Sequence, residues 1–95
     1  MKLWLDDVRP APPGWVQART IEEAQRWLVT GEVEEASLDH DLGVEQPDGR
    51  ALVRWMAQTG HWPKHRPVVH SMNPVGRMYM EGVIERYFGK RPEDA

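Results

Sequence analysis

The chain has 95 residues, and its 12 Lys and Arg against 15 Asp and Glu give a formal net charge of −3. This length predicts a single domain over residues 1–95, because domains usually hold about 100–150 residues. The absence of cysteine excludes disulfides and thiolate-bound metals, and the acid excess argues against sequence-specific DNA binding. No apolar run approaches the roughly 20 residues that cross a bilayer and no signal peptide is evident, so we expect a cytoplasmic protein without membrane association.

Short apolar runs that stop at polar residues indicate the strands. Residues 2–5, 36–38 and 67–69 each have this pattern and are predicted to be buried strands. Residues 15–18 are compatible with a further edge strand. The intervening residues 9–14 hold three prolines and a glycine, so they are predicted to form a loop.

Three predicted helices alternate with these strands. The first begins at Thr20, which forms a capping box with Glu23, and the second covers residues 50–58. Asn73 caps the third helix and Pro74 occupies its first position, where proline is tolerated. The apolar stripe of this last helix comprises Val75, Met78, Tyr79, Gly82 and Val83.

The alternation of strands and helices predicts an α/β fold. We expect a small three-layer sandwich, with a mostly parallel sheet of three or four strands and right-handed crossovers that place helices on both faces. Most tryptophan and methionine side chains are predicted to belong to the core. The sequence does not fix the oligomeric state.

Polar residues follow each of the three predicted buried strands. Each residue alone has a plain structural explanation, such as capping a turn. The carboxyl ends of parallel strands share one edge of a sheet, however, and ligands bind at this edge. The polar residues expected at this edge are Asp6, Asp7 and Arg9 after the first strand, Asp39, His40 and Asp41 after the second, and His70, Ser71, Asn73 and Arg77 after the third.

The acids of this edge favour a divalent metal. Asp6, Asp7, Asp39 and Asp41 would repel one another unless a cation or protons relieved them, and oxygen ligands suit Mg²⁺. The neighbouring histidines extend the choice to Mn²⁺ or Zn²⁺.

The remaining polar groups suggest phosphate-ester chemistry. His40 and His70 can serve as acid and base near neutral pH. Arg9, Ser71, Asn73 and Arg77, with the amino end of the last helix, are candidate phosphate-binding groups. The expected partner is a small phosphate ester or an RNA end.

Three motifs resemble the cyclic-phosphate processing receiver-like domain family, a trimmed relative of response-regulator receivers. They are LDDVRP at residues 5–10, SLDHDLG at residues 37–43 and VHSMNPVGR at residues 69–77. The resemblance covers almost the whole chain and implies a receiver/flavodoxin-like fold. Three features depart from a plain receiver. The last strand with its phosphate-contacting lysine is not visible, a Pro-rich loop replaces the first helix, and His40, Asp41, His70 and Asn73 are additions that a plain receiver does not need.

The resemblance also implies roles for single residues. Asp6 and Asp7 match the acidic pair that holds Mg²⁺ in receivers, and Asp39 matches the phospho-accepting aspartate. Ser71 matches the hydroxyl residue that contacts the phosphoryl group, and Gly49 matches a loop glycine.

Three functions remain open at this stage. The first is a metal-assisted phosphoesterase acting on a cyclic phosphate, either an RNA 2′,3′-cyclic end or a cyclic nucleotide, with Asp39, His40 and His70 as catalytic residues. Its nucleophile is a metal-bound water or, as the receiver resemblance implies, Asp39 itself. The second is a non-enzymatic signalling module that is phosphorylated or binds metal at Asp39. The third is a small cellular or phage regulator that acts through protein contacts.

Overall fold

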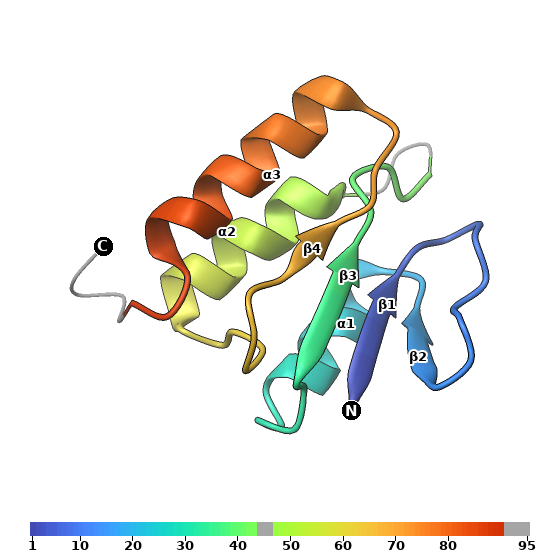
Figure 1. Cartoon of the computed structure of the whole chain (residues 1–95), viewed down its shortest axis with the longest axis horizontal. Coiled ribbons are helices and arrows are strands. Elements are labelled where there is room, and N and C mark those ends of the chain that lie inside the picture. The colour runs from blue at the N-terminus through green and yellow to red at the C-terminus, as the bar shows by residue number, and fades with distance from the viewer. Residues whose placement is uncertain (44–46, 91–95) are drawn as a thin grey trace.

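The computed structural model describes residues 1–43 and 47–90, which form one parallel sheet and three helices (Figure 1). The sheet order is β2-β1-β3-β4, and every neighbouring pair is parallel. The strands are β1 (Lys2–Leu5), β2 (Trp15–Ala18), β3 (Glu35–Leu38) and β4 (Val68–Val69). The predicted edge strand is thus confirmed, and the described residues contain no fifth strand after β4.

The helices are α1 (Ile21–Leu28), α2 (Gly49–Thr59) and α3 (Pro74–Tyr87). Each begins at a side-chain cap, because Thr20, Asp48 and Asn73 accept hydrogen bonds from backbone N–H groups of the following turn. Among the described residues, no helix is both long and apolar enough to cross a bilayer.

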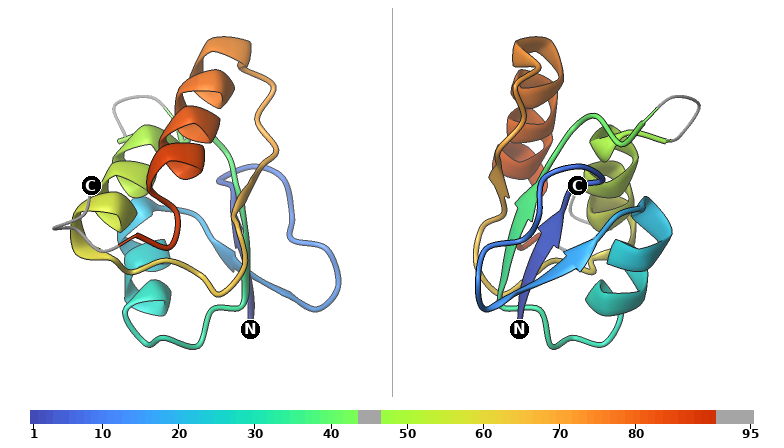
Figure 2. Two further views of the ribbon diagram at one scale, coloured as in Figure 1. Left: turned by 60° about the vertical axis from the view of Figure 1, so that its left-hand side comes forward. Right: turned by 90° about the vertical axis from the view of Figure 1, so that its right-hand side faces the viewer.

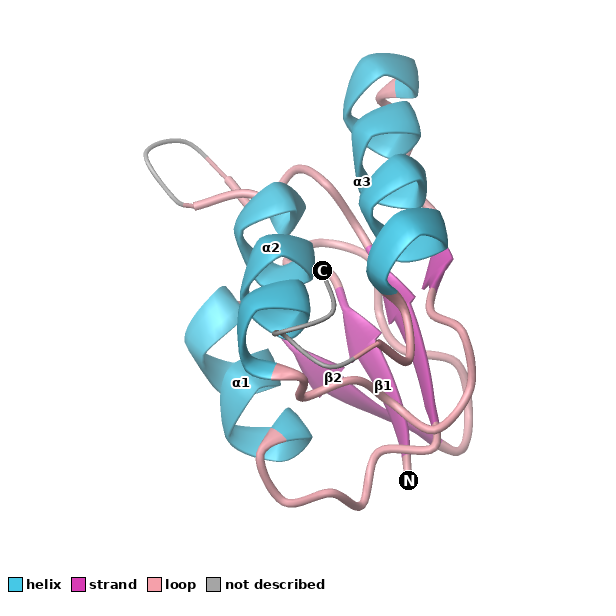
Figure 3. Cartoon of the chain, turned by 90° about the vertical axis from the view of Figure 1, so that its left-hand side faces the viewer, coloured by secondary structure: helices cyan, strands magenta, loops and turns pink. Residues whose placement is uncertain are grey.

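All three helices lie on one face of the sheet, with α2 between α1 and α3 (Figures 2 and 3). The parallel α/β sheet is confirmed, whereas the expected helix layer on the second face is not found in the described part of the chain. The direction in which successive connections cross the sheet explains why the helices lie on one face. From β2 to β3 and from β3 to β4 the chain crosses the sheet the same way, so right-handed crossovers place both helices on one side. The reverse step, from β1 to β2, contains no helix.

The Pro-rich loop partly covers the second face. The Trp4 indole N–H donates to the Arg9 carbonyl at 3.1 Å, and the Gln17 amide donates to the carbonyls of Asp6 and Arg9 at 2.8 and 2.9 Å. In the left view of Figure 2 this loop lies on the opposite side of the sheet from the helices. We call the sheet surface on this side the loop face.

The core fills the space between the sheet and the helices. Alternation along β1 and β3 sends Leu3, Leu5 and Leu38 toward the helices, where they are completely buried. From α2 and α3, Met56 and Met80 meet them.

Most of the apolar stripe predicted on α3 faces away from this core, whereas its member Val83 is half-buried and packs against it. Its members Val75, Met78 and Tyr79 are 78%, 72% and 41% exposed, whereas the buried residues of the helix are Gly76, Met80 and Ile84. Helix α3 therefore has apolar side chains on two sides. The expectation for tryptophan also fails in part, since Trp27 is exposed and Trp4, Trp15, Trp55 and Trp62 are only partly buried.

Candidate metal and phosphate site

The ends of β1, β3 and β4 bring the predicted polar residues to one edge of the sheet. An open cavity of about 360 Å³ lies there. Its lining residues are Asp6, Asp7, Val8, Arg9, Asp39, Asp41, Gly43 and Met72. We call this cavity the acidic cavity. It gathers all four predicted metal-binding carboxylates and one predicted phosphate-binding arginine.

Asp6 is the best-anchored carboxylate of the cavity. It is 1% exposed, and its Oδ1 accepts hydrogen bonds from the N–H groups of Val8 and Arg9 at 2.9 and 2.8 Å. Its Oδ2 lies 3.0 Å from His70 Nε2. Burial alone would raise the pKa of Asp6, but these hydrogen bonds outweigh it and hold the pKa below its usual value. Asp6 is therefore a fixed negative charge at neutral pH.

Asp39 lies beside Asp6 in a less favourable environment. Burial and the negative charge of Asp6 raise the pKa of Asp39, and the hydrogen bond from the His40 N–H to Oδ1, at 2.9 Å, only partly compensates. The folded protein thus holds two carboxylates together, and the ionised form of Asp39 is less favourable there than in water. A bound cation would relieve this repulsion.

His70 completes the group of donors that fits a metal. One donor atom from each of Asp6, Asp39 and His70 lies within 4.8 Å of the other two. Two carboxylate oxygens and one imidazole nitrogen suit Mg²⁺, Mn²⁺ or Zn²⁺. Asp7 and Asp41 line the same cavity but are not part of this close cluster.

The His70 ring is held on three sides. It stacks on Trp4, with ring centroids 4.0 Å apart and planes 7° from parallel, and its Nδ1 lies 2.7 Å from the Ser37 hydroxyl. Because Asp6 is ionised, Nε2 carries the proton when it faces Asp6, and Ser37 then donates to Nδ1. If Nε2 instead bound a metal, the proton would move to Nδ1 and the same hydroxyl would accept it. Ser37 can therefore support both tautomers of His70.

His40 lies beneath the cavity rather than in its wall. The ring is buried, with Nδ1 2.8 Å from Asp41 Oδ1 and Nε2 3.5 Å from Asp48 Oδ2. A Cβ atom at Gly76 would overlap the His40 ring, so the first turn of α3 packs directly against the imidazole. The His40 side chain thus links the loop after β3 to the starts of α2 and α3.

The predicted phosphate-binding residues occupy different places. The buried Ser71 hydroxyl accepts from the Asn73 N–H at 3.1 Å, and Asn73 Oδ1 accepts from the Gly76 N–H at 3.0 Å as the cap of α3. Arg9 reaches across the cavity to the His70 carbonyl, with Nη1 at 3.4 Å. Arg77 instead lies 3.4 Å from Glu81 and lines a separate groove along β4.

Four residues that support the site were not predicted from the sequence. Trp4 and Ser37 are neighbours in the β1–β3 register, and both lie on the loop face beside His70. Alternation along each strand does separate them from the core residues, but their contact with His70 depends on strand register. Asp48 and Gly76 touch His40 only because α2 and α3 converge there. The resemblance also singled out Gly49. A glycine is required there because a Cβ would overlap the Asp39 carbonyl.

A parallel sheet of order β2-β1-β3-β4, with acids at the ends of β1 and β3, is a receiver-like α/β domain. The chain belongs to the family of cyclic-phosphate processing receiver domains, whose family model matches residues 1–86. Neither the curated proteins nor the solved structures contain a match to the chain.

Proposed function

We propose that the protein is a divalent-cation-dependent phosphoesterase that opens a cyclic phosphate, either at the 2′,3′-cyclic end of an RNA or in a cyclic nucleotide. The observation that carries the proposal is the cluster of Asp6, Asp39 and His70 donors at the carboxyl edge of the sheet. Membership of a cyclic-phosphate processing family supports the choice of substrate class.

The two aspartates would hold the cation, and Mg²⁺ suits their oxygens best. A divalent cation at this position would stabilise negative charge on the phosphoryl oxygens. Asp7 and Asp41 line the same cavity, and in this proposal they would add negative charge around the cation. Arg9 is the arginine that lines the cavity, so it is the side chain best placed to orient the phosphate.

Ring opening requires one water and one proton transfer. The water oxygen bonds to phosphorus, one of the two ring P–O bonds breaks, and a proton from the water ends on the departing sugar oxygen. The product is a phosphomonoester with a neighbouring hydroxyl. His70 is the titratable group of the cluster that can move this proton at Nε2, with Ser37 balancing the change at Nδ1.

His40 has a positioning role in this proposal. Its buried ring is held by Asp41 and Asp48, so it fixes the backbone that follows Asp39. Asn73 and Ser71 set the start of α3 beside the site, and the side-chain amide of Asn73 and the hydroxyl of Ser71 remain able to donate to an anion.

The test is hydrolysis by purified protein with Mg²⁺, Mn²⁺ or Zn²⁺ and with EDTA. Substrates are a 2′,3′-cyclic nucleotide, a 3′,5′-cyclic nucleotide, an RNA with a 2′,3′-cyclic end and a linear monoester, with products followed by ³¹P NMR. We expect cation-dependent opening of a cyclic substrate, and a loss of about 10²–10⁴-fold in kcat for His70→Ala. Asp39→Asn should require much more cation for any residual activity.

Glu85→Gln is the matched control, because it removes an exposed carboxylate of α3 outside the acidic cavity. Absence of turnover on every substrate with every cation would overturn the proposal. A mass increase on Asp39 after incubation with a small phosphodonor, without turnover, would instead support a signalling module. Unchanged cellular function in the Asp7→Ala, Asp39→Ala and His70→Ala variants would leave a regulator that acts through surface contacts.

A further inference from the structure

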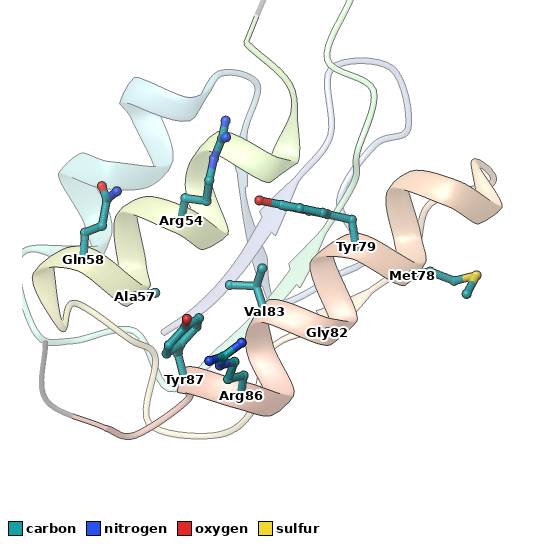
Figure 4. Close-up of a pocket in the computed structure, with 9 residues that line it drawn as sticks. All are labelled: Arg54, Ala57, Gln58, Met78, Tyr79, Gly82, Val83, Arg86 and Tyr87. Carbon is teal, nitrogen blue, oxygen red and sulfur yellow. The ribbon is translucent and has the colours of Figure 1, made fainter. Parts of the chain in front are cut away.

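The exposed apolar side of α3 borders a groove that no part of the described chain fills. The groove runs between α2 and α3 and has a volume of about 800 Å³ (Figure 4). Ala57 and Val83 form its floor, Tyr79 reaches from α3 toward α2, where its ring lies 5.9 Å from the Arg50 guanidinium, and Arg86 lies farther along α3. Val75, Met78 and Tyr79 continue the apolar surface along the same helix.

The spacing of the groove residues shows that they lie on one side of α2 and one side of α3. Arg54, Ala57 and Gln58 share one side of α2, and the α3 residues recur at intervals of three and four. Two parallel ridges with an apolar floor between them form the kind of groove that accepts an amphipathic helix.

Gly82 is difficult to explain by the fold alone. It lies in the interior of α3, where glycine is less stable than alanine, and a Cβ at this position would meet open space. Neither a close contact nor a positive φ requires glycine here. A residue without a side chain on the groove wall lets another backbone approach closely.

The charge of the groove indicates the kind of partner. Arg54 and Arg86 line it, and none of its lining residues is acidic. Other arginines of these helices have acidic partners: Arg50 binds Asp48 at 2.9 Å and Arg77 lies 3.4 Å from Glu81. No such ion pair occurs for Arg54 or Arg86 among residues 1–43 and 47–90. In a chain of net charge −3, this groove is locally positive.

We propose that the α2–α3 groove docks an amphipathic helix of a partner protein, with an apolar stripe against Ala57, Gly82 and Val83 and acidic residues opposite Arg54 and Arg86. The apolar stripe would enter the floor of the groove, and the flanking carboxylates would pair with the two guanidinium groups. This surface is separate from the acidic cavity, so the proposal does not depend on the phosphoesterase activity.

The probe is a displayed library of helical peptides of about 18 residues, long enough to follow α3 along its whole length. Binders to the wild-type chain are selected without reference to any variant. We expect enrichment of peptides with apolar residues at helical spacing and Asp or Glu beside them. The best peptide is then titrated in ¹⁵N-labelled protein, where shifted amide signals should map to α2 and α3.

Two variants separate docking from a structural effect. Gly82→Leu should keep or raise the melting temperature, because leucine is a good helix former and meets open space, yet weaken the peptide by about tenfold or more. The double variant Arg54→Glu with Arg86→Glu should prefer the peptide in which Lys replaces each acid.

Several results would overturn the proposal. They are enrichment of basic peptides or of none, an unchanged preference after charge reversal, and signal changes confined to the acidic cavity. Binding of single-stranded RNA to the groove in an Arg54- and Arg86-dependent way, or sedimentation as a dimer that Gly82→Leu abolishes, would replace the partner helix with a different occupant and so reject this one.

Discussion

At the scale of single residues, Ser37 allows His70 to carry its proton on either ring nitrogen. Its hydroxyl lies 2.7 Å from Nδ1, while Nε2 faces the ionised Asp6. A hydroxyl can donate or accept by rotation, so it satisfies Nδ1 in either tautomer. Removing it leaves Nδ1 in a partly buried place without a partner, and the ring loses one of its three restraints.

We therefore expect Ser37→Ala to lower kcat by about 10–100-fold, the range found when a group that orients an active-site histidine is lost. The melting temperature should fall by about 4–8 °C, since one neutral hydrogen bond contributes about 1 kcal/mol. Imidazole ¹⁵N shifts report the tautomer of His70, and the rate of ring opening reports its proton transfer. Ser37→Thr, which keeps the hydroxyl, is the control. Equal kcat in Ser37→Ala and wild type would show that Ser37 does not orient His70.

At the scale of elements, periodicity in the sequence located every strand and helix but not the orientation of each. Helix α1 has one apolar side, and it buries Ile21, Ala24 and Leu28. Helix α3 has two, and the more regular one faces outward at Val75, Met78 and Tyr79, although its last member, Val83, packs against the core. Periodicity identifies a stripe, and only packing decides which stripe becomes buried.

The one-sided sheet has a similar cause. Composition showed that residues 9–14 cannot be helical, and this segment is the only described connection that crosses the sheet in the reverse direction. The strand-end acids were predictable because they follow local apolar runs. Contacts of His70 with Trp4 and Ser37 were not, because they depend on the register between β1, β3 and β4.

Two glycines of α3 make a matched pair that tests how this helix is packed. A Cβ at Gly76 would overlap the His40 ring, whereas a Cβ at Gly82 would meet open space. Gly76→Ala should lower the free energy of unfolding by about 2 kcal/mol, because overpacking forces neighbours to move. Gly82→Ala should raise it by about 0.5–1 kcal/mol through better helix propensity.

Urea unfolding followed by tryptophan fluorescence measures both changes. Each variant is the other's control, since the same substitution is made in the same helix. Destabilisation by both would mean that the groove beside Gly82 is already filled. Stabilisation by both would show that the packing of α3 against His40 does not require glycine at position 76.

At the scale of the whole molecule, the carboxylates that would bind a cation also change the free energy of unfolding. Asp6 contributes stability above its unfolded pKa, because its folded pKa is lowered. Asp39 acts in the opposite sense. Its folded pKa is raised, so the folded chain binds the proton more tightly, and stability falls as pH rises from the unfolded pKa through the folded one. At neutral pH the ionised Asp39 therefore opposes folding until a cation binds.

Asp39→Asn should accordingly show two opposite effects on thermal unfolding. In EDTA at pH 7 the variant should melt above the wild type, and this advantage should shrink in acid as Asp39 of the wild type takes up its proton. With Mg²⁺ at about 100 times its dissociation constant, the wild type should gain about 2.7 kcal/mol, whereas the variant should gain little, so that the order of stability reverses. Glu85→Gln, which changes a carboxylate outside the cavity, should follow the wild type in both conditions. A variant that melts below the wild type in EDTA, or that gains as much from Mg²⁺, would mean that Asp39 serves the fold rather than a cation.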